Sequence, residues 1–227
     1  MMGLVVLACL SACGKPEALS ASFPVPELVA VEADDGVHIV ARVETRAGQT
    51  GVVTQVRVID GSKTVLGKFE LPPGTEPSSY GTHILAPIGT KEVGFEMDLV
   101  EAPGKPPTVL SRGPLSTAPR YSDNFSMDGK RLGSAPRLPD VAWYKDTAGV
   151  HIACALAHDE PEVTALLIKS SDGTVLGRRE RGPGPIGLYV LAPGELPVFE
   201  VVVEKNIKLD NGQPWPLTTS TRHEVNP

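Results

Sequence analysis

Apolar and polar residues alternate with a period of two along most of the chain. In the stretch GVHIVARV, which begins at Gly36, the apolar residues Val37, Ile39 and Ala41 fall on every second position. The runs VVTQVRVI (52–59) and VFEVVV (198–203) are rich in β-branched residues, whose stiff side chains suit a pleated surface. Because side chains of a strand alternate between its two faces, the pattern predicts short, half-buried β-strands.

Turn-forming segments separate these runs throughout the sequence. They include DDG, DGSK, PPGTEP, APIG, SSDG, GPGP, APGE and DNG. No stretch of ten or more residues has the apolar spacing of a helix. The best helix candidate, EPEVTALLIK (160–169), corresponds to the β-rich QTGVVTQVRV, and we therefore expect a strand there. Short strands at regular spacing without helices predict an all-β sandwich or barrel.

The sequence contains an internal repeat. GVHIVARV, which begins at Gly36, returns as GVHIACAL, which begins at Gly149. Further pairs follow in the same order: DGSKTVLGK with DGTVLGR, LAP with LAP, FE with FE, and LST with LTT. The separation of matching residues falls from 113 (Gly36 to Gly149) to 102 (Leu115 to Leu217), which predicts two copies of one domain. The shorter DGT places the first loss of residues in a hairpin turn.

Each copy is about 90 residues long, which is enough for a domain with its own core. We predict a first β-sandwich at 24–118, a linker at 119–137 and a second β-sandwich at 138–227. The linker, PRYSDNFSMDGKRLGSAPR, is polar and has no strand or helix period. Such a linker allows two domains to change their relative orientation, and the sequence leaves open whether they dock. The predicted architecture, two tandem antiparallel β-sandwiches, resembles immunoglobulin-like and fibronectin type III-like domains of bacterial surface proteins.

The N-terminus reads MMGLVVLACLSACGK. Its apolar run is long enough for a signal peptide and too short to span a bilayer. The tetrapeptide Leu10-Ser11-Ala12-Cys13 resembles the lipobox of bacterial lipoproteins. The resemblance implies a signal peptide at 1–12, a lipid-modified Cys13, a tether at 13–23 and attachment to the outer membrane. The alternative is an N-terminal core segment that ends in LSAC by coincidence.

The remaining composition argues against several function classes. The net charge is −6 without a basic cluster, so we expect no nucleic-acid partner. No nucleotide, metal or nucleophile motif occurs, and we expect no cofactor and no metal. If Cys9 and Cys13 are lost or lipidated, Cys154 is left alone on an apolar strand face, where a structural thiol is favoured.

Two sets of side chains remain as candidates for chemistry. His38 and His151 are equivalent in the repeat, and we predict that each occupies a solvated strand position in its own domain. Trp143, Tyr144 and Trp215 are candidate ligand contacts, because glycans stack on exposed rings and one of the neighbours Trp143 and Tyr144 must face outward.

These observations favour a non-enzymatic cell-envelope lipoprotein that acts as a binding or scaffold module for another envelope protein. A glycan-binding or peptidoglycan-binding lipoprotein that uses the aromatic residues of the second copy is the alternative. A hydrolase built on loops is a minor alternative, since no converging acid and base are visible in the sequence.

Overall fold

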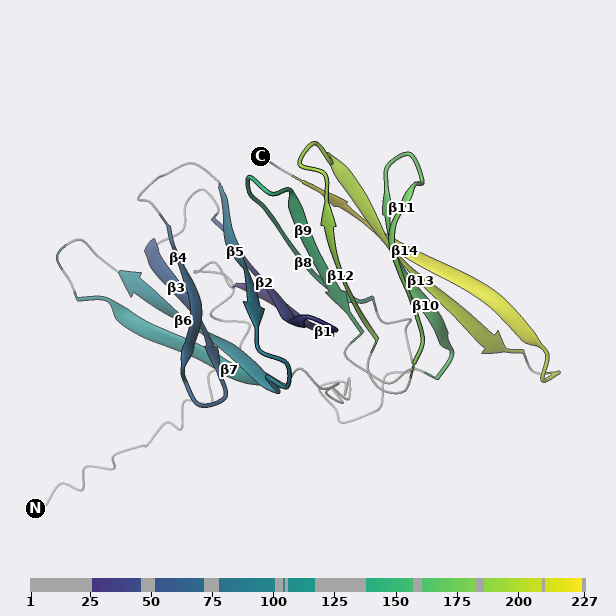
Figure 1. Cartoon of the computed structure of the whole chain (residues 1–227), viewed down its shortest axis with the longest axis horizontal. Coiled ribbons are helices and arrows are strands. Elements are labelled where there is room, and N and C mark those ends of the chain that lie inside the picture. The colour runs from purple at the N-terminus through teal and green to yellow at the C-terminus, as the bar shows by residue number, and fades with distance from the viewer. Residues whose placement is uncertain are drawn as a thin grey trace, which may run out of the picture.

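The computed structural model describes residues 26–45, 52–71, 78–100, 104, 106–116, 138–156, 161–182, 186–209 and 211–225. Every regular element in these ranges is a β-strand, and the strands form four antiparallel sheets. The predicted fold class is confirmed: the chain is all-β, with two tandem immunoglobulin-like sandwiches (Figure 1). Within the described residues there is no helix long and apolar enough to cross a membrane.

The first sandwich pairs a three-stranded sheet with a four-stranded sheet. The smaller sheet has the order β1-β2-β5 and the larger β4-β3-β6-β7. The strands are β1 (Glu27–Ala33), β2 (Gly36–Glu44), β3 (Val52–Asp60), β4 (Val65–Glu70), β5 (Ser79–Ala86), β6 (Glu92–Val100) and β7 (Thr108–Ser116).

The second sandwich repeats this topology strand for strand. Its smaller sheet has the order β12-β9-β8 and its larger sheet β11-β10-β13-β14. The strands are β8 (Asp140–Lys145), β9 (Val150–Ala155), β10 (Val163–Ser170), β11 (Val175–Glu180), β12 (Gly187–Ala192), β13 (Val198–Lys208) and β14 (Pro214–Glu224). Within the stretch 160–169, for which a strand is predicted, residues 163–169 lie in β10.

The strand pairing corrects the alignment of the two copies. The β3–β4 turn runs from Asp60 to Thr64 and the β10–β11 turn from Ser170 to Thr174, with matching backbone hydrogen bonds. These turns have equal length, so the predicted loss of residues in this hairpin is wrong. Both copies also carry bulges at equivalent places, one of them beside Ile59 and Lys169. The loss lies earlier, because Arg42 to Val53 spans more residues than its counterpart, Ala155 to Val163.

The last two matches of the predicted alignment are also out of register. Phe95 lies opposite Val58, whereas Val201 lies opposite the equivalent Ile168, so Phe95 corresponds to Val201 and not to Phe199. LST and LTT likewise occupy different places, because β13 and β14 form a longer hairpin than β6 and β7.

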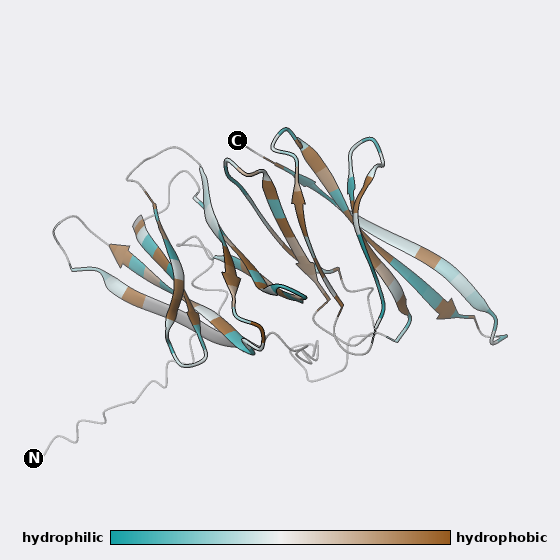
Figure 2. Cartoon of the chain, viewed as in Figure 1, coloured by the Kyte–Doolittle hydropathy of each residue, from teal (hydrophilic) through white to brown (hydrophobic). Residues whose placement is uncertain are grey.

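A hydrophobic core fills the space between the two sheets of each sandwich. In the second sandwich Ile152, Cys154, Leu166 and Phe199 belong to one buried cluster. Figure 2 shows hydrophobic residues along the inner strands and a mostly hydrophilic or neutral β14. Burial of apolar surface contributes about 25 cal/mol per Å² and is the main favourable contribution to the stability of each sandwich.

The two sandwiches dock on each other through their three-stranded sheets. In Figure 1 the four sheets form successive layers, with the two small sheets in the middle. Val29, Val31 and Val40 of the first sandwich pack against Ala142 and Ala153 of the second. The central sheets are therefore covered on both faces, which explains why eight of the nine residues of β2 are buried.

The contacts between the sandwiches follow a pseudo-two-fold pattern. A Cβ atom added to Gly81 would lie 2.9 Å from Tyr144 Cδ2, and one added to Gly187 would lie 3.1 Å from Val31 Cγ1. Gly81 and Gly187 occupy equivalent positions in the repeat, as do Val31 and Tyr144. Gly81 therefore faces Tyr144, and its equivalent Gly187 faces Val31, the equivalent of Tyr144. The same exchange of contacts occurs in the interface of a symmetric dimer.

We expect Gly81→Ala to lower the free energy of unfolding by roughly 1–3 kcal/mol, as overpacking in close-packed sites does. The added methyl group would lie 2.6 Å from the backbone oxygen of Ala41 as well as against Tyr144. Urea denaturation followed by intrinsic fluorescence measures the change. Gly182→Ala is the control, because nothing lies within 4 Å of a Cβ there. Equal unfolding midpoints for the two variants would contradict the close approach.

Candidate functional site

Four polar rings meet between the docked sandwiches. They belong to His38 on β2, His83 on β5, His151 on β9 and Tyr189 on β12. His38 is 7% exposed and His151 is 5% exposed. The prediction that these two histidines are solvated is wrong. They do point away from the core of their own sandwich, but that face is covered by the other sandwich.

In the first sandwich, three side chains form a hydrogen-bonded arm. His38 Nε2 lies 2.9 Å from Asp35 Oδ1, and His38 Nδ1 lies 3.0 Å from His83 Nε2. The hydrogen bond with His38 lowers the pKa of Asp35, which favours an ionised carboxylate. A carboxylate only accepts, so a neutral His38 donates its Nε2–H to Asp35 and accepts at Nδ1 from the Nε2–H of His83.

The second sandwich contains an equivalent arm that ends in a phenol. His151 Nε2 lies 3.1 Å from Asp146 Oδ2, and His151 Nδ1 lies 2.7 Å from the Tyr189 hydroxyl. The same reasoning gives a neutral His151 that donates to Asp146 and accepts from the Tyr189 O–H. Tyr189 therefore takes the place that His83 has in the first sandwich, and both residues donate to the central histidine.

The two arms stack on each other across the interface. The ring centroids of His38 and Tyr189 are 3.9 Å apart, and those of His83 and His151 are 4.4 Å apart. The interplanar angles are 17° and 16°, so the rings lie nearly parallel. Each ring of one arm thus rests on a ring of the other arm, which adds contact energy across the interface beyond the apolar packing.

Burial and neighbouring charges shift the pKa values of His83 and Tyr189, the rings that donate to the two central histidines. Burial, together with the potential positive charges on His151 and His38, lowers the pKa of His83 to about 4. Burial raises the pKa of Tyr189 to about 12, with further contributions from Asp146 and Asp35. Burial would also raise the pKa of Asp146, but hydrogen bonds from the Ala148 amide and His151 give a net decrease. Neutral His83 and Tyr189 therefore face two ionised carboxylates at neutral pH.

Asp146, His151 and Tyr189 follow one another as carboxylate, histidine and hydroxyl, the sequence of groups in an acid–base relay. The pKa of the hydroxyl does not suit a relay. A relay of carboxylate, histidine and hydroxyl activates a nucleophile when the hydroxyl loses its proton readily. Tyr189 has the opposite tendency, because its pKa is raised. No group of side chains suited to a metal occurs among the described residues. The geometry favours holding the two sheets together.

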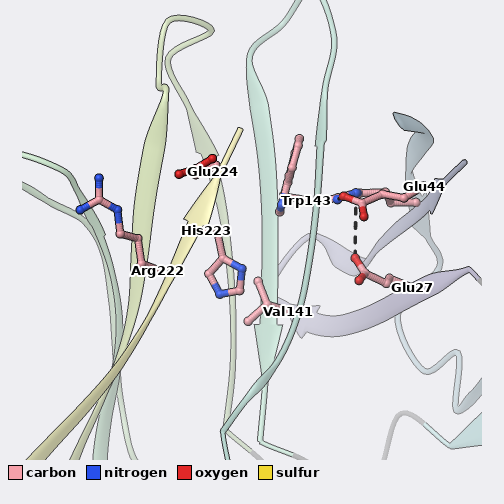
Figure 3. Close-up of a pocket in the computed structure, with 8 residues that line it drawn as sticks. Glu27, Glu44, Val141, Trp143, Arg222, His223 and Glu224 are labelled. Atoms are coloured by element: carbon pink, nitrogen blue, oxygen red, sulfur yellow. Dashed lines mark ion pairs between the residues drawn. The ribbon is translucent and has the colours of Figure 1, made fainter. Parts of the chain in front are cut away.

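A second polar feature lies at the edge of the same interface. The Arg42 guanidinium is buried and stands 3.9 Å above the ring of Trp143 in the other sandwich, which is within cation–π distance. Arg42 also forms ion pairs with Glu27 and Glu44. A cavity of about 300 Å³ opens beside these groups, and His223 on β14 lines its opposite side (Figure 3).

This cavity offers little to a ligand. Arg42 Nε is buried and has no hydrogen-bond partner. His223 Nε2 lies 3.0 Å from the Thr221 hydroxyl, and burial, together with the charge of Arg42, lowers the pKa of His223. Three glutamates and two arginines line the cavity, so its formal charge is negative and an anion is not favoured there.

The structure separates the three predicted aromatic ligand contacts. Trp143 is only 4% exposed and belongs to the core of the second sandwich, while Tyr144 is partly buried in the interface. The expectation that one of these neighbours faces solvent is wrong, because both faces of β8 are covered. Trp215 is 55% exposed at the start of β14. Of the three, Trp215 alone offers an open ring to a ligand.

The other predicted residues fall into two groups. Cys13 and the expected signal peptide, tether and linker lie outside the described residues. Cys154 is fully buried, and burial raises the pKa of its thiol, which keeps the thiol protonated and unreactive.

A signal for the ring cluster was present in the sequence. In the second copy the residues that alternate with the core positions of β9 are His151, Ala153 and Ala155. Small apolar residues on the face that should be solvated indicate a covered face. Comparison with known proteins adds no assignment, since no family model matches the chain and no curated protein matches it.

We expect Tyr189→Phe to destabilise the protein by about 1–3 kcal/mol, the usual cost of a buried polar atom that loses its partner. The variant keeps the stacked ring but removes the O–H that His151 Nδ1 accepts. Chemical denaturation at pH 7 measures the loss. Trp215→Phe is the control, since its ring is exposed and should change stability by less than about 0.5 kcal/mol. The assigned hydrogen bond would be refuted if both substitutions had the same small effect.

Proposed function

We propose that the chain is a non-enzymatic, lipid-anchored protein of the bacterial cell envelope that serves as a rigid binding or scaffold module for another envelope protein. Cys13 is the proposed lipid attachment site and the outer membrane the proposed location. The observation that carries this proposal is the docking of the two sandwiches into one four-layer body. A scaffold must present its binding surfaces at a defined spacing, and a docked pair does so.

The commitment of the ionisable groups to the interface supports a non-catalytic role. The nitrogen atoms of His38 and His151 are all engaged with Asp35, Asp146, His83 and Tyr189. These hydrogen bonds and stacks account for the buried histidines without a substrate. A general base needs a free lone pair within reach of a substrate, and neither central histidine has one.

The outer sheets provide the surfaces that remain for a partner. Their outward faces carry charged networks: Arg57 Nη1 and Nη2 bind Asp98 at 2.8 and 2.7 Å, and Arg178 binds Glu204. Charged faces of this kind resist nonspecific association. A sheet edge offers backbone hydrogen bonds to an added strand.

β14 is the edge strand best suited to this use. It has eleven residues and keeps one continuous register with β13, and from Leu217 onward it contains no proline. The edge strands β4 and β11 have only six residues each, and β7 contains Pro114. We therefore place the proposed contact with the partner at the exposed edge of β14.

Glycan binding remains a second proposal, because Trp215 is exposed near the start of β14. It now depends on this residue alone. If it is correct, soluble cell-wall fragments quench the fluorescence of Trp215 and Trp215→Phe abolishes the response. An unchanged spectrum with every fragment would remove this alternative.

For the scaffold proposal, we expect a photo-crosslinking residue at Ser220 to capture one defined envelope protein in intact cells. Ser220 is exposed in the middle of β14, and Lys68, exposed on the edge strand β4, is the matched control position. Mass spectrometry identifies the product. In the Cys13→Ala background the protein should leave the membrane fraction, and the Ser220 product should fall at least severalfold because the local concentration is lost.

Two results would contradict the scaffold proposal. One is the same set of products from Ser220 and Lys68, which would indicate random collision. The other is a Cys13→Ala variant that stays in the membrane fraction, which would show that Cys13 does not anchor the protein.

A further inference from the structure

We propose that the four-ring cluster is an acid-sensitive latch: it holds the two sandwiches together at neutral pH, and a third proton, bound by His83 when His38 and His151 are already protonated, separates them while each keeps its fold. This inference concerns regulation and does not depend on the lipid anchor or on the identity of a partner. It rests on the number of protons that the hydrogen-bonding geometry can accommodate.

Two protons fit into the cluster. A protonated His38 donates from Nε2 to Asp35 and from Nδ1 to His83 Nε2, provided that His83 accepts there. A protonated His151 donates to Asp146 and to the oxygen of Tyr189, whose hydroxyl can rotate. Each added charge lies next to a carboxylate, so neither proton breaks the arrangement.

The third proton does not fit. A protonated His83 carries hydrogen on both ring nitrogens, so its Nε2–H would point at the Nδ1–H of His38 over a distance of 3.0 Å. Its ring would also lie against the protonated His151, with 4.4 Å between centroids. The groups that face His83 from the packed elements are His38 (β2), His151 (β9) and Tyr189 (β12), with Asp35 and Asp146 in the adjoining turns. Three positive rings would then face two carboxylates.

The direction of the pH dependence follows from the same groups. The pKa of His83 is lowered from 6.5 to about 4, first by burial and then by His151 and His38. Solvated His83 therefore binds more protons than docked His83, and the docked state loses stability as the pH falls from about 6.5 through about 4.

Separation is favoured over unfolding because the cluster lies outside both cores. The core of the second sandwich occupies the opposite face of β9, among Ile152, Leu166 and Phe199. The buried apolar cluster of the interface is smaller than that core and consists of Val29, Val31, Val40, Ala142 and Ala153. Once the sandwiches separate, His83 can turn into water and no longer faces His151.

The experiment uses the full chain with Cys13→Ala, so that no lipid can be attached at residue 13. Small-angle X-ray scattering measures the radius of gyration between about pH 7.5 and about pH 4, and far-ultraviolet circular dichroism follows the strands. We expect the radius to increase below about pH 6 with the strand signal unchanged. A cysteine pair at Val31→Cys and Gly187→Cys locks the interface, since a Cβ on residue 187 lies 3.1 Å from Val31 Cγ1. The oxidised form should stay compact at every pH, and its reduced form should open.

Two exchanges between the arms test His83 itself. His83→Tyr gives the first arm the composition of the second and removes the third proton, so opening should move to lower pH by about one unit or more. Tyr189→His adds a fourth titrating ring, so opening should move to higher pH. The opposite directions keep the test decisive even if one variant folds poorly.

Three outcomes would overturn the latch. The first is a constant radius of gyration down to about pH 4. The second is loss of the strand signal together with the increase in radius, which would mean unfolding. The third is an unchanged opening midpoint in both exchange variants.

Discussion

The structure depends on a constraint at its centre, which is that the two three-stranded sheets are covered on both faces. A sheet in this position cannot leave polar side chains without partners, because water does not reach them. The chain satisfies them with Asp35 and Asp146 from the turns and with rings from the neighbouring strands. The same constraint accounts for Gly81 and Gly187, where the two small sheets approach closely, and for the burial of β2 along nearly its whole length.

The docked interface determines which surfaces of the protein remain exposed. With their histidines engaged at the interface, the sandwiches present charged sheet faces, short edge strands and one long edge strand, β14. The proposed contact with a partner uses the edge of β14. If the interface responds to acid, then the pH around the protein sets the spacing of the outer sheets.

The strands could be predicted from the sequence because alternation is a local property. The docking could not, because period-two alternation shows which residues share a face but not what covers the second face. His38 and Arg42 are residue types typical of a solvated face, and only their small neighbours in the second copy, Ala153 and Ala155, indicate a covered one. The register errors at Phe95 and Asp60 have a similar origin, since short identical strings recur by chance two residues from the true match.

The pairing of Arg42 with Trp143 shows what a covalently joined pair gains over a dimer of identical chains. In a homodimer every substitution appears twice around the axis, so a bulky cation on one side requires the same cation on the other. Here the position equivalent to Arg42 is Ala155 and the one equivalent to Trp143 is Ala30. Each half can therefore carry its own substitutions, and one end of the pseudo-symmetric contact is chemically distinct from the other.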